Sequence, residues 1–281
     1  MLSINRNRPP DAVQNQLDLM KSIGDQQKAI STGKRLIKPS DDPQGWLEVS
    51  VIARQQGNEE AWVANIGRAE TRAVQAESSM SEITSGLIRA KELVLQSNND
   101  SINAVNREGI AIELEGILAN IRDIMTQDDP FGGKLFAEIA IEVPIGGTRH
   151  VIASPTAQQL FGKAPGSAPG ASMIEDLLLE TIDAVRNGTQ ADRNSRLTPL
   201  DGAIDYMTAM LTQQGVARGR LESARNQFIE SRVVLAERRQ EIEDTNVSEA
   251  ITKLQALDIS LEAAQAVYAK ITQRSLLDYL R

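Results

Sequence analysis

The sequence predicts a mainly α-helical protein: a long antiparallel helical bundle or coiled coil, formed by the N- and C-terminal segments, with a small β-containing insert. Two observations predict this fold. In both halves of the chain, apolar residues recur at alternating spacings of four and three, which is the repeat of packed helices. Between the halves the spacing changes to two, as in a β-strand.

A first helix is predicted for residues 11 to about 32, ending before Gly33, a typical residue just beyond a helix C-terminus. A second helix is predicted to begin at Pro43, because Asp42 can accept hydrogen bonds from the free amides of the first turn. We expect it to continue, with a pause at Gly57, into a strict heptad seam. The seam consists of Trp62, Ile66, Ala69, Ala73, Ala76, Met80, Ile83, Leu87, Ala90 and Val94.

The polar stretch 97–101 predicts a turn, and so short a connection favours an antiparallel hairpin with the helix that follows. The seam of that third helix is Ile110, Leu114, Ile117, Ile121 and Ile124. Beyond residues 129–133, alternation on both sides of a two-residue Gly146-Gly147 turn predicts a β-hairpin. Residues 164–170, rich in proline and glycine, predict a loop.

Helical periodicity returns at about residue 172 and ends at Asn187-Gly188. The next helix carries apolar residues at seven-residue intervals, namely Leu221, Phe228, Leu235 and Ile242. Residues 244–246 are expected to interrupt this helix. The last seam is Val247, Ala250, Leu254, Leu257, Leu261, Ala264, Tyr268 and Ile271.

The elements predict five segments. These are an N-terminal assembly helix and linker (1–40), the N-terminal half of the bundle (41–130), a small insert (131–171), the C-terminal half of the bundle (172–244) and a C-terminal assembly helix (245–281). Because the heptads stop before the insert and resume after it, we expect the insert to add little to the helical seams. Its removal, over residues of about 138–170, is expected to leave assembly intact.

Composition excludes several classes of function. A net charge of -8 argues against nucleic acid and against an anionic membrane surface, since both need a basic face. The absence of cysteine excludes disulfides, thiolate metal sites and a cysteine nucleophile. No apolar stretch reaches transmembrane length, so no membrane insertion is expected. The polar start has no general secretory signal, which leaves the cytoplasm or export without a cleaved signal.

The sequence does not predict an enzyme, a cofactor or a metal site. His150 is the single histidine and is expected to be an ordinary strand residue. The carboxylates of Asp41 and Asp42 are expected to cap a helix rather than to bind a cation. The pairs Glu59-Glu60 and Arg238-Arg239 are expected on solvated helix faces.

The terminal helices are predicted to carry the function. An apolar chain end has to be buried, either by its own bundle or by neighbouring subunits. The candidate assembly residues are Val13, Leu17, Met20, Ile23, Ile30, Leu254, Leu257, Leu261, Ala264, Tyr268, Ile271, Leu276, Leu277 and Leu280.

Residues 31–35, followed by Pro39-Ser40-Asp41-Asp42-Pro43, resemble the N-terminal signature of the bacterial flagellin family. Residues 133–137 are similar to the point where that family leaves its N-terminal helices. Four stretches of the chain resemble the C-terminal helix of the family: residues 242–244, 249–255, 264–271 and 275–280.

The resemblance implies a secreted, structural part of the bacterial flagellum. It implies that the terminal helices pair as a coiled coil at the inner wall of a helical homo-oligomeric tube, after unfolded export through the flagellar type III channel. The implied partners are flagellin, a junction protein on the hook side and an export chaperone at the C-terminal helix. The expected role is to join hook to filament; the alternatives are a filament-forming flagellin and, more remotely, a cytoplasmic helical scaffold.

Overall fold

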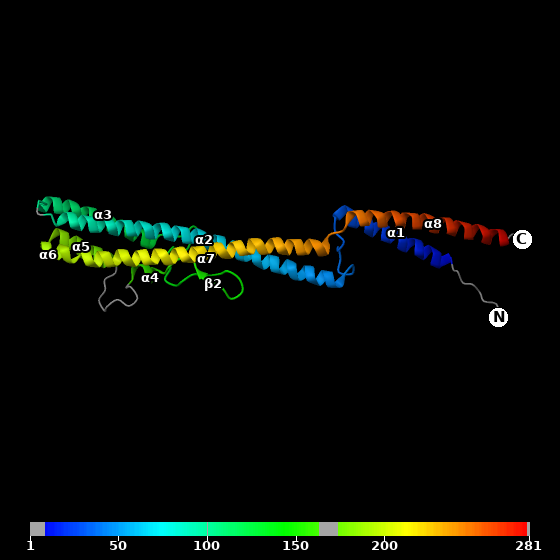
Figure 1. Cartoon of the computed structure of the whole chain (residues 1–281), viewed down its shortest axis with the longest axis horizontal. Coiled ribbons are helices and arrows are strands. Elements are labelled where there is room, and N and C mark those ends of the chain that lie inside the picture. The colour runs from blue at the N-terminus through cyan, green and yellow to red at the C-terminus, as the bar shows by residue number, and fades with distance from the viewer. Residues whose placement is uncertain (1–8, 100, 163–173, 280–281) are drawn as a thin grey trace. The chain divides into compact units, whose positions relative to one another are not determined.

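The computed structural model describes the backbone of residues 9–99, 101–162 and 174–279 and the side chains of 13–99, 101–162 and 174–270. The chain forms two compact units, one of residues 58–230 and one of residues 1–57 with 231–281. Figure 1 shows the order of the elements along the chain. The predicted loop at 164–170 lies outside the described residues.

In the unit of residues 58–230, helix α2 (Pro43–Ser97) and helix α3 (Ala104–Thr126) form the predicted antiparallel hairpin. Arg89 Nε lies 2.8 Å from Glu113 Oε1, and Asn120 Nδ2 donates to Glu82 Oε1 at 2.7 Å, so the two helices run in opposite directions. Every seam residue of α2 from Ile66 to Val94 is buried, which confirms the heptad prediction. Helix α2 runs through Gly57 without the expected pause.

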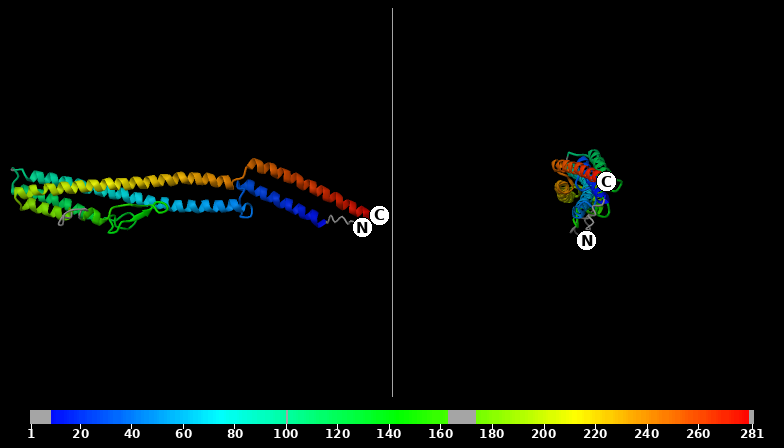
Figure 2. Two further views of the ribbon diagram at one scale, coloured as in Figure 1. Left: turned by 60° about the horizontal axis from the view of Figure 1, so that its bottom comes forward. Right: turned by 90° about the vertical axis from the view of Figure 1, so that its right-hand side faces the viewer.

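Helix α5 (Ile174–Arg186) packs against α3, and helix α7 (Leu197–Glu243) is tied to α2 by the ion pairs Lys91–Asp201 and Glu77–Arg218. These helices lie side by side in Figure 2. Between α5 and α7 lies helix α6 (Gln190–Ser195), which the sequence analysis did not predict. It is too short to show a period, but Thr189 and Asp192 form a capping box at its start.

The insert contains strands β1 (Glu142–Pro144) and β2 (His150–Ile152) and helix α4 (Ala157–Phe161). The strands pair antiparallel, with Val143 opposite Val151, as predicted. The turn is one residue longer than predicted. Ile145 N donates to Arg149 O at 2.9 Å, which leaves three residues in the loop. Gly146 and Gly147 supply the positive φ angles of 113° and 54° that the loop requires.

The expectation that the insert adds little to the core is wrong. Seven apolar side chains of the segment between α3 and α5 are buried in the bundle: Leu135, Phe136, Ile145, Val151, Ala153, Leu160 and Phe161. The physical reason lies on α2, where Ala69 and Ala73 form the part of the seam that faces Ile145 and Val151. Alanine fills little volume, so the hairpin completes the packing there.

In the other unit, helix α1 (Pro9–Thr32) packs beside helix α8 (Val247–Tyr279) (Figure 1). The segment before α2, the start of α2 and the end of α7 share a small core of Leu36, Val49, Ile52 and Ile242, with Trp46 and Leu235 partly buried against it. Over the part of the chain that the structure describes, no helix is long and apolar enough to cross a membrane.

Candidate functional site

The terminal helices α1 and α8 form the candidate site. On α8 the least exposed face follows the predicted heptad seam from its second residue: Val247 is 44% exposed, but Ala250 is buried and the described residues that follow it in the seam are half-buried. Those are Leu254, Leu257, Leu261, Ala264 and Tyr268. On α1, Ile23 is buried and Ile30 half-buried, and Gln16 Nε2 donates to Ala264 O at 3.4 Å. These residues therefore serve first to pair the two helices.

A second group of candidate residues points away from this pairing. Val13, Leu17 and Met20, spaced by four and then three, are 41%, 54% and 50% exposed. On α8, Ile259 and Val267 are 67% and 57% exposed. Such stripes are available to another chain. The heptad pattern does not predict Ile259 and Val267, because both residues lie off the heptad seam of α8.

Four of the candidates cannot be placed. The side chains of Ile271, Leu276 and Leu277, and the whole of Leu280, lie outside the described residues.

The linker between α1 and α2 is held by its carboxylates. Asp42 Oδ1 accepts from Gly45 N at 3.0 Å, and α2 begins at Pro43, so the predicted helix cap is confirmed. The expectation that Asp41 also caps the helix is wrong, because its Oδ2 accepts from two amides of the linker before α2, Lys38 N at 3.0 Å and Ile37 N at 3.2 Å. Desolvation would raise the pKa of Asp41, but these amides and the charge of Lys38 hold it below its usual range.

The same linker meets the end of α7. Residues 33–36 lie antiparallel to residues 242–245, with Lys34 bridged to Asp244. We refer to these two segments together as the clasp. Arg35 N donates to Glu243 O at 2.7 Å, and Thr245 N donates to Gly33 O at 2.9 Å. Gly33 makes this path possible with a φ of 69°, in the left-handed region that glycine favours.

Glu243 lies at the centre of the clasp with a side chain 10% exposed. Its carboxylate lies 2.7 Å from Lys34 Nζ and 2.9 Å from Arg239 Nε. Burial would raise the pKa of Glu243, but the hydrogen bonds and charges of these two cations lower it below the ordinary value.

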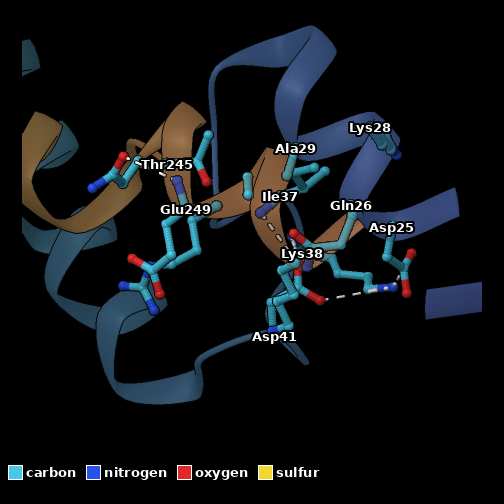
Figure 3. Close-up of a pocket in the computed structure, with 13 residues that line it drawn as sticks. Asp25, Gln26, Lys28, Ala29, Ile37, Lys38, Asp41, Thr245 and Glu249 are labelled. Carbon is cyan, nitrogen blue, oxygen red and sulfur yellow. Dashed lines mark hydrogen bonds and ion pairs between the residues drawn. The ribbon is translucent and has the colours of Figure 1, made fainter. Parts of the chain in front are cut away.

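A polar cavity of about 340 Å³ lies beside the clasp, between α1, the linker and α8. Figure 3 shows Lys38 reaching both Asp25 and Asp41, at 3.9 Å and 3.7 Å. The carboxylates of Asp25 and Asp41 are thus engaged with Lys38, and that of Asp41 also with backbone amides. Among the side chains that the structure describes, no group of three or more His, Asp or Glu residues is placed to hold a metal ion.

Charged residues elsewhere also have structural roles. Arg72, which the sequence analysis did not single out, is 4% exposed. It is ion-paired with Asp129 and donates to Ser154 Oγ at 2.8 Å and to Leu135 O at 2.7 Å, so it ties α2 to the insert. The expectation for Glu59 was wrong, because this residue is 3% exposed. His150 is exposed at the start of β2.

Terminal helices that pair along one seam and expose apolar stripes elsewhere are typical of a subunit of a helical assembly. The chain belongs to the bacterial flagellin family, whose members are structural subunits of the flagellum. Residues 4–140 match the bacterial flagellin N-terminal helical region, and residues 197–280 match the bacterial flagellin C-terminal helical region. Together the two matches cover well over half of the chain.

Two curated relatives are each named flagellar hook-associated protein 3. That of Salmonella typhimurium is 28% identical over 123 residues, which is 44% of this chain but only 38% of the relative, well under two thirds of its length. That of Escherichia coli is 23% identical over 237 residues, 76% of this chain and 72% of the relative.

A solved structure of the flagellar junction protein FlgL from Legionella pneumophila has a similar fold. It superimposes with a TM-score of 0.56 at 12% identity, over 70% of this chain and 99% of that one.

Proposed function

We propose that this chain is the subunit that joins the flagellar hook to the filament. One observation carries the proposal: the Escherichia coli relative that aligns with 76% of this chain is named a flagellar hook-associated protein. The filament-forming flagellin is the alternative. Only a short hairpin and one turn of helix are described between α3 and α5, which suits an adaptor better than a subunit with a large outer domain.

Assembly would use the terminal segments 1–40 and 245–281. The exposed stripe of Val13, Leu17 and Met20 on α1, with Ile259 and Val267 on α8, would be covered by neighbouring copies in a helical tube. Covering a leucine, methionine or isoleucine contributes roughly 1.5–3 kcal/mol when it becomes fully buried. These residues would supply part of the free energy of association in each subunit, with flagellin on one side and a hook-side junction protein on the other.

The same apolar stripes would need cover before assembly. We propose an export chaperone that binds α8, because an exposed stripe on a long helix suits recognition in an apolar groove.

Deletion of the gene, followed by electron microscopy of the cell surface, tests the proposal. A junction subunit predicts hooks without filaments and flagellin shed into the medium, with filaments restored by a plasmid copy. Absence of flagellin protein from both cell and medium would instead identify the chain as the filament subunit. Normal filaments in the deletion strain would refute both roles.

A further inference from the structure

We propose that glycine at open positions inside the long helices keeps the unit of residues 58–230 easy to unfold, so that the chain can leave the cell before it assembles. The first half of the proposal concerns the isolated chain. The second half rests on the proposed function.

Six glycines lie inside α2, α3 and α7 at positions where the fold gives no reason for glycine. None of them has the positive φ angle that favours this residue. A Cβ atom added at any of them would meet no heavy atom of the described residues within 4 Å, apart from the backbone of its own helix. Alanine would therefore fit at each position. We refer to these residues as the open glycines: Gly67, Gly109, Gly116, Gly202, Gly215 and Gly219.

Other glycines of the same unit are required by their surroundings. Gly146 has a φ of 113°, and a Cβ atom there would come within 2.8 Å of the Phe228 ring. Gly86 lies inside α2 like Gly67, but its Cβ atom would meet Ile117 Cγ2 of α3 at 3.2 Å. The open glycines have no such neighbour, so packing within the described part of the chain does not explain them.

Glycine inside a helix lowers stability, because an unfolded glycine has more backbone freedom to lose than an alanine. Each replacement by alanine at a compatible position favours the folded state by about two- to fivefold. Well-separated positions add, so six replacements amount to a factor on the order of a hundred or more. Small domains have folded-to-unfolded ratios of about 10³ to 10⁸. The open glycines therefore take away a large part of the stability that this bundle could have.

A bundle that unfolds readily suits a subunit that works outside the cell. Helix α2 has 55 residues, so at 1.5 Å per residue it is roughly 80 Å long. A folded bundle of this length needs a wide passage, whereas an unfolded chain passes in single file. Low stability lowers the cost of unfolding before that step. Contacts between subunits then stabilise the folded chain after assembly.

Urea unfolding of the full-length isolated chain, followed by circular dichroism, tests the first half. The variant with alanine at all six open glycines is expected to have a higher midpoint and a folding equilibrium constant raised by about a hundredfold or more. Gly86→Ala is the matched control, because it makes the same change inside α2 where room is short, and its midpoint should stay the same or fall. An unchanged or lower midpoint in the six-alanine variant overturns the proposal.

The amount of chain in the culture medium and inside the cells tests the second half. The share of the six-alanine variant in the medium should fall by about tenfold, because passage then draws on a smaller unfolded population. Gly86→Ala should leave the cell as well as the parent does. Equal shares of the six-alanine variant and the parent in the medium overturn this half.

Purified protein added to cells that lack the gene separates this role from a contact between subunits. The six-alanine variant should restore filaments as the parent does, since it needs no export there. Failure of the variant where the parent succeeds would mean that the open glycines serve close contact with a neighbouring subunit, and it overturns the proposal. Failure of the parent itself would count against the proposed function, while the urea results still decide the first half.

Discussion

Arg72 is a charged side chain that the fold buries, and its contacts all lie in the segment between α3 and α5. Asp129 pairs with it, and Ser154 Oγ and the backbone carbonyls of Lys134 and Leu135 accept its other hydrogen bonds. Burying a charge is expensive unless it is paired and fully hydrogen-bonded. Arg72 therefore stabilises this fold only together with its partners.

Arg72→Met is expected to destabilise the protein by about 3–5 kcal/mol, because it leaves the Asp129 carboxylate buried without its cation. Urea unfolding followed by circular dichroism measures the change. Arg68→Met, one turn earlier at an exposed position, is the control and should stay within about 0.5 kcal/mol of the parent. Equal stability of both variants would mean that the ion pair contributes nothing.

Asp129 should also make stability depend on pH. Burial would raise its pKa, but hydrogen bonds from Gly133 and Phe131 and the charge of Arg72 hold the pKa below its usual range. A carboxyl with a lowered pKa stabilises the fold fully above its unfolded value of about 3.9, and the contribution is lost as pH falls below that value. Asp129→Asn should therefore be less stable than the parent at pH 7, and the difference should shrink on acidification. A difference independent of pH would contradict this.

At the scale of elements, α8 uses two faces for two purposes. The seam at Leu254, Leu257 and Leu261 meets α1, whereas Ile259 and Val267 face away from it. A helix with one apolar seam needs one partner, and a helix with additional exposed apolar residues is suited to more. Substitutions on the two faces should therefore have different effects.

Leu261→Asp is expected to open the α1–α8 pair in the isolated chain and to abolish assembly, because it places a carboxylate in the seam. The distance between spin labels at Asn15→Cys and Glu262→Cys, two exposed positions on α1 and α8, measures the first effect, and filament formation on cells measures the second. Gln255→Glu, at another exposed position on α8, should change neither. Normal joining by Leu261→Asp would show that the seam is dispensable.

Ile259→Asp should leave the pair closed but weaken assembly, since this side chain is 67% exposed in the isolated chain. The same two measurements apply. If Ile259→Asp opened the α1–α8 pair, Ile259 would belong to the seam. If assembly were unchanged, Ile259 would not lie in the interface between subunits.

At the scale of the whole molecule, each unit draws on both halves of the sequence. In the unit of residues 58–230, α2 and α7 are joined through the insert as well as directly, since Gln214 Nε2 on α7 donates to Ala153 O at 2.8 Å. The insert thus contributes both apolar side chains and hydrogen-bond acceptors to that unit.

Removal of residues 138–162 is therefore expected to destabilise the unit of residues 58–230, whereas the sequence alone predicts that assembly survives the loss of residues of about 138–170. The deletion takes away buried Val151, Leu160 and Phe161, and large apolar truncations each cost about 2–5 kcal/mol. Urea unfolding measures the loss of stability. His150→Ala changes an exposed residue of the same hairpin and serves as the control, which should be as stable as the parent. Parent-like stability of the deletion would show that the buried side chains of the insert are not needed to hold this unit together.

Limited proteolysis should distinguish the two units in the isolated chain. Segments 1–40 and 245–281 should be cut before the seam of 62–94, because α1 and α8 are less buried than α2. Incorporation into the flagellar joint should protect them. Equal cutting before and after incorporation would argue that other surfaces hold the subunits together.

The sequence by itself determined the features that depend on near neighbours. Heptad spacing determined the seams of α2, α3 and α7, and Asp42 with Pro43 determined the start of α2, because each signal lies within a few residues of what it specifies. On α8 the same spacing identified the seam but missed the exposed Ile259 and Val267.

Tertiary structure alone decided which charges are buried and which distant segments meet. Arg72, Glu59 and Glu243 look like surface residues when only their neighbours are read, and each is buried by the fold. The pairing of residues 33–36 with 242–245 has no local signal, because backbone amides and carbonyls are alike in every residue. Long-range contacts of this kind depend on the packing of all the helices between them, and that packing leaves no periodic trace in the segments that it brings together.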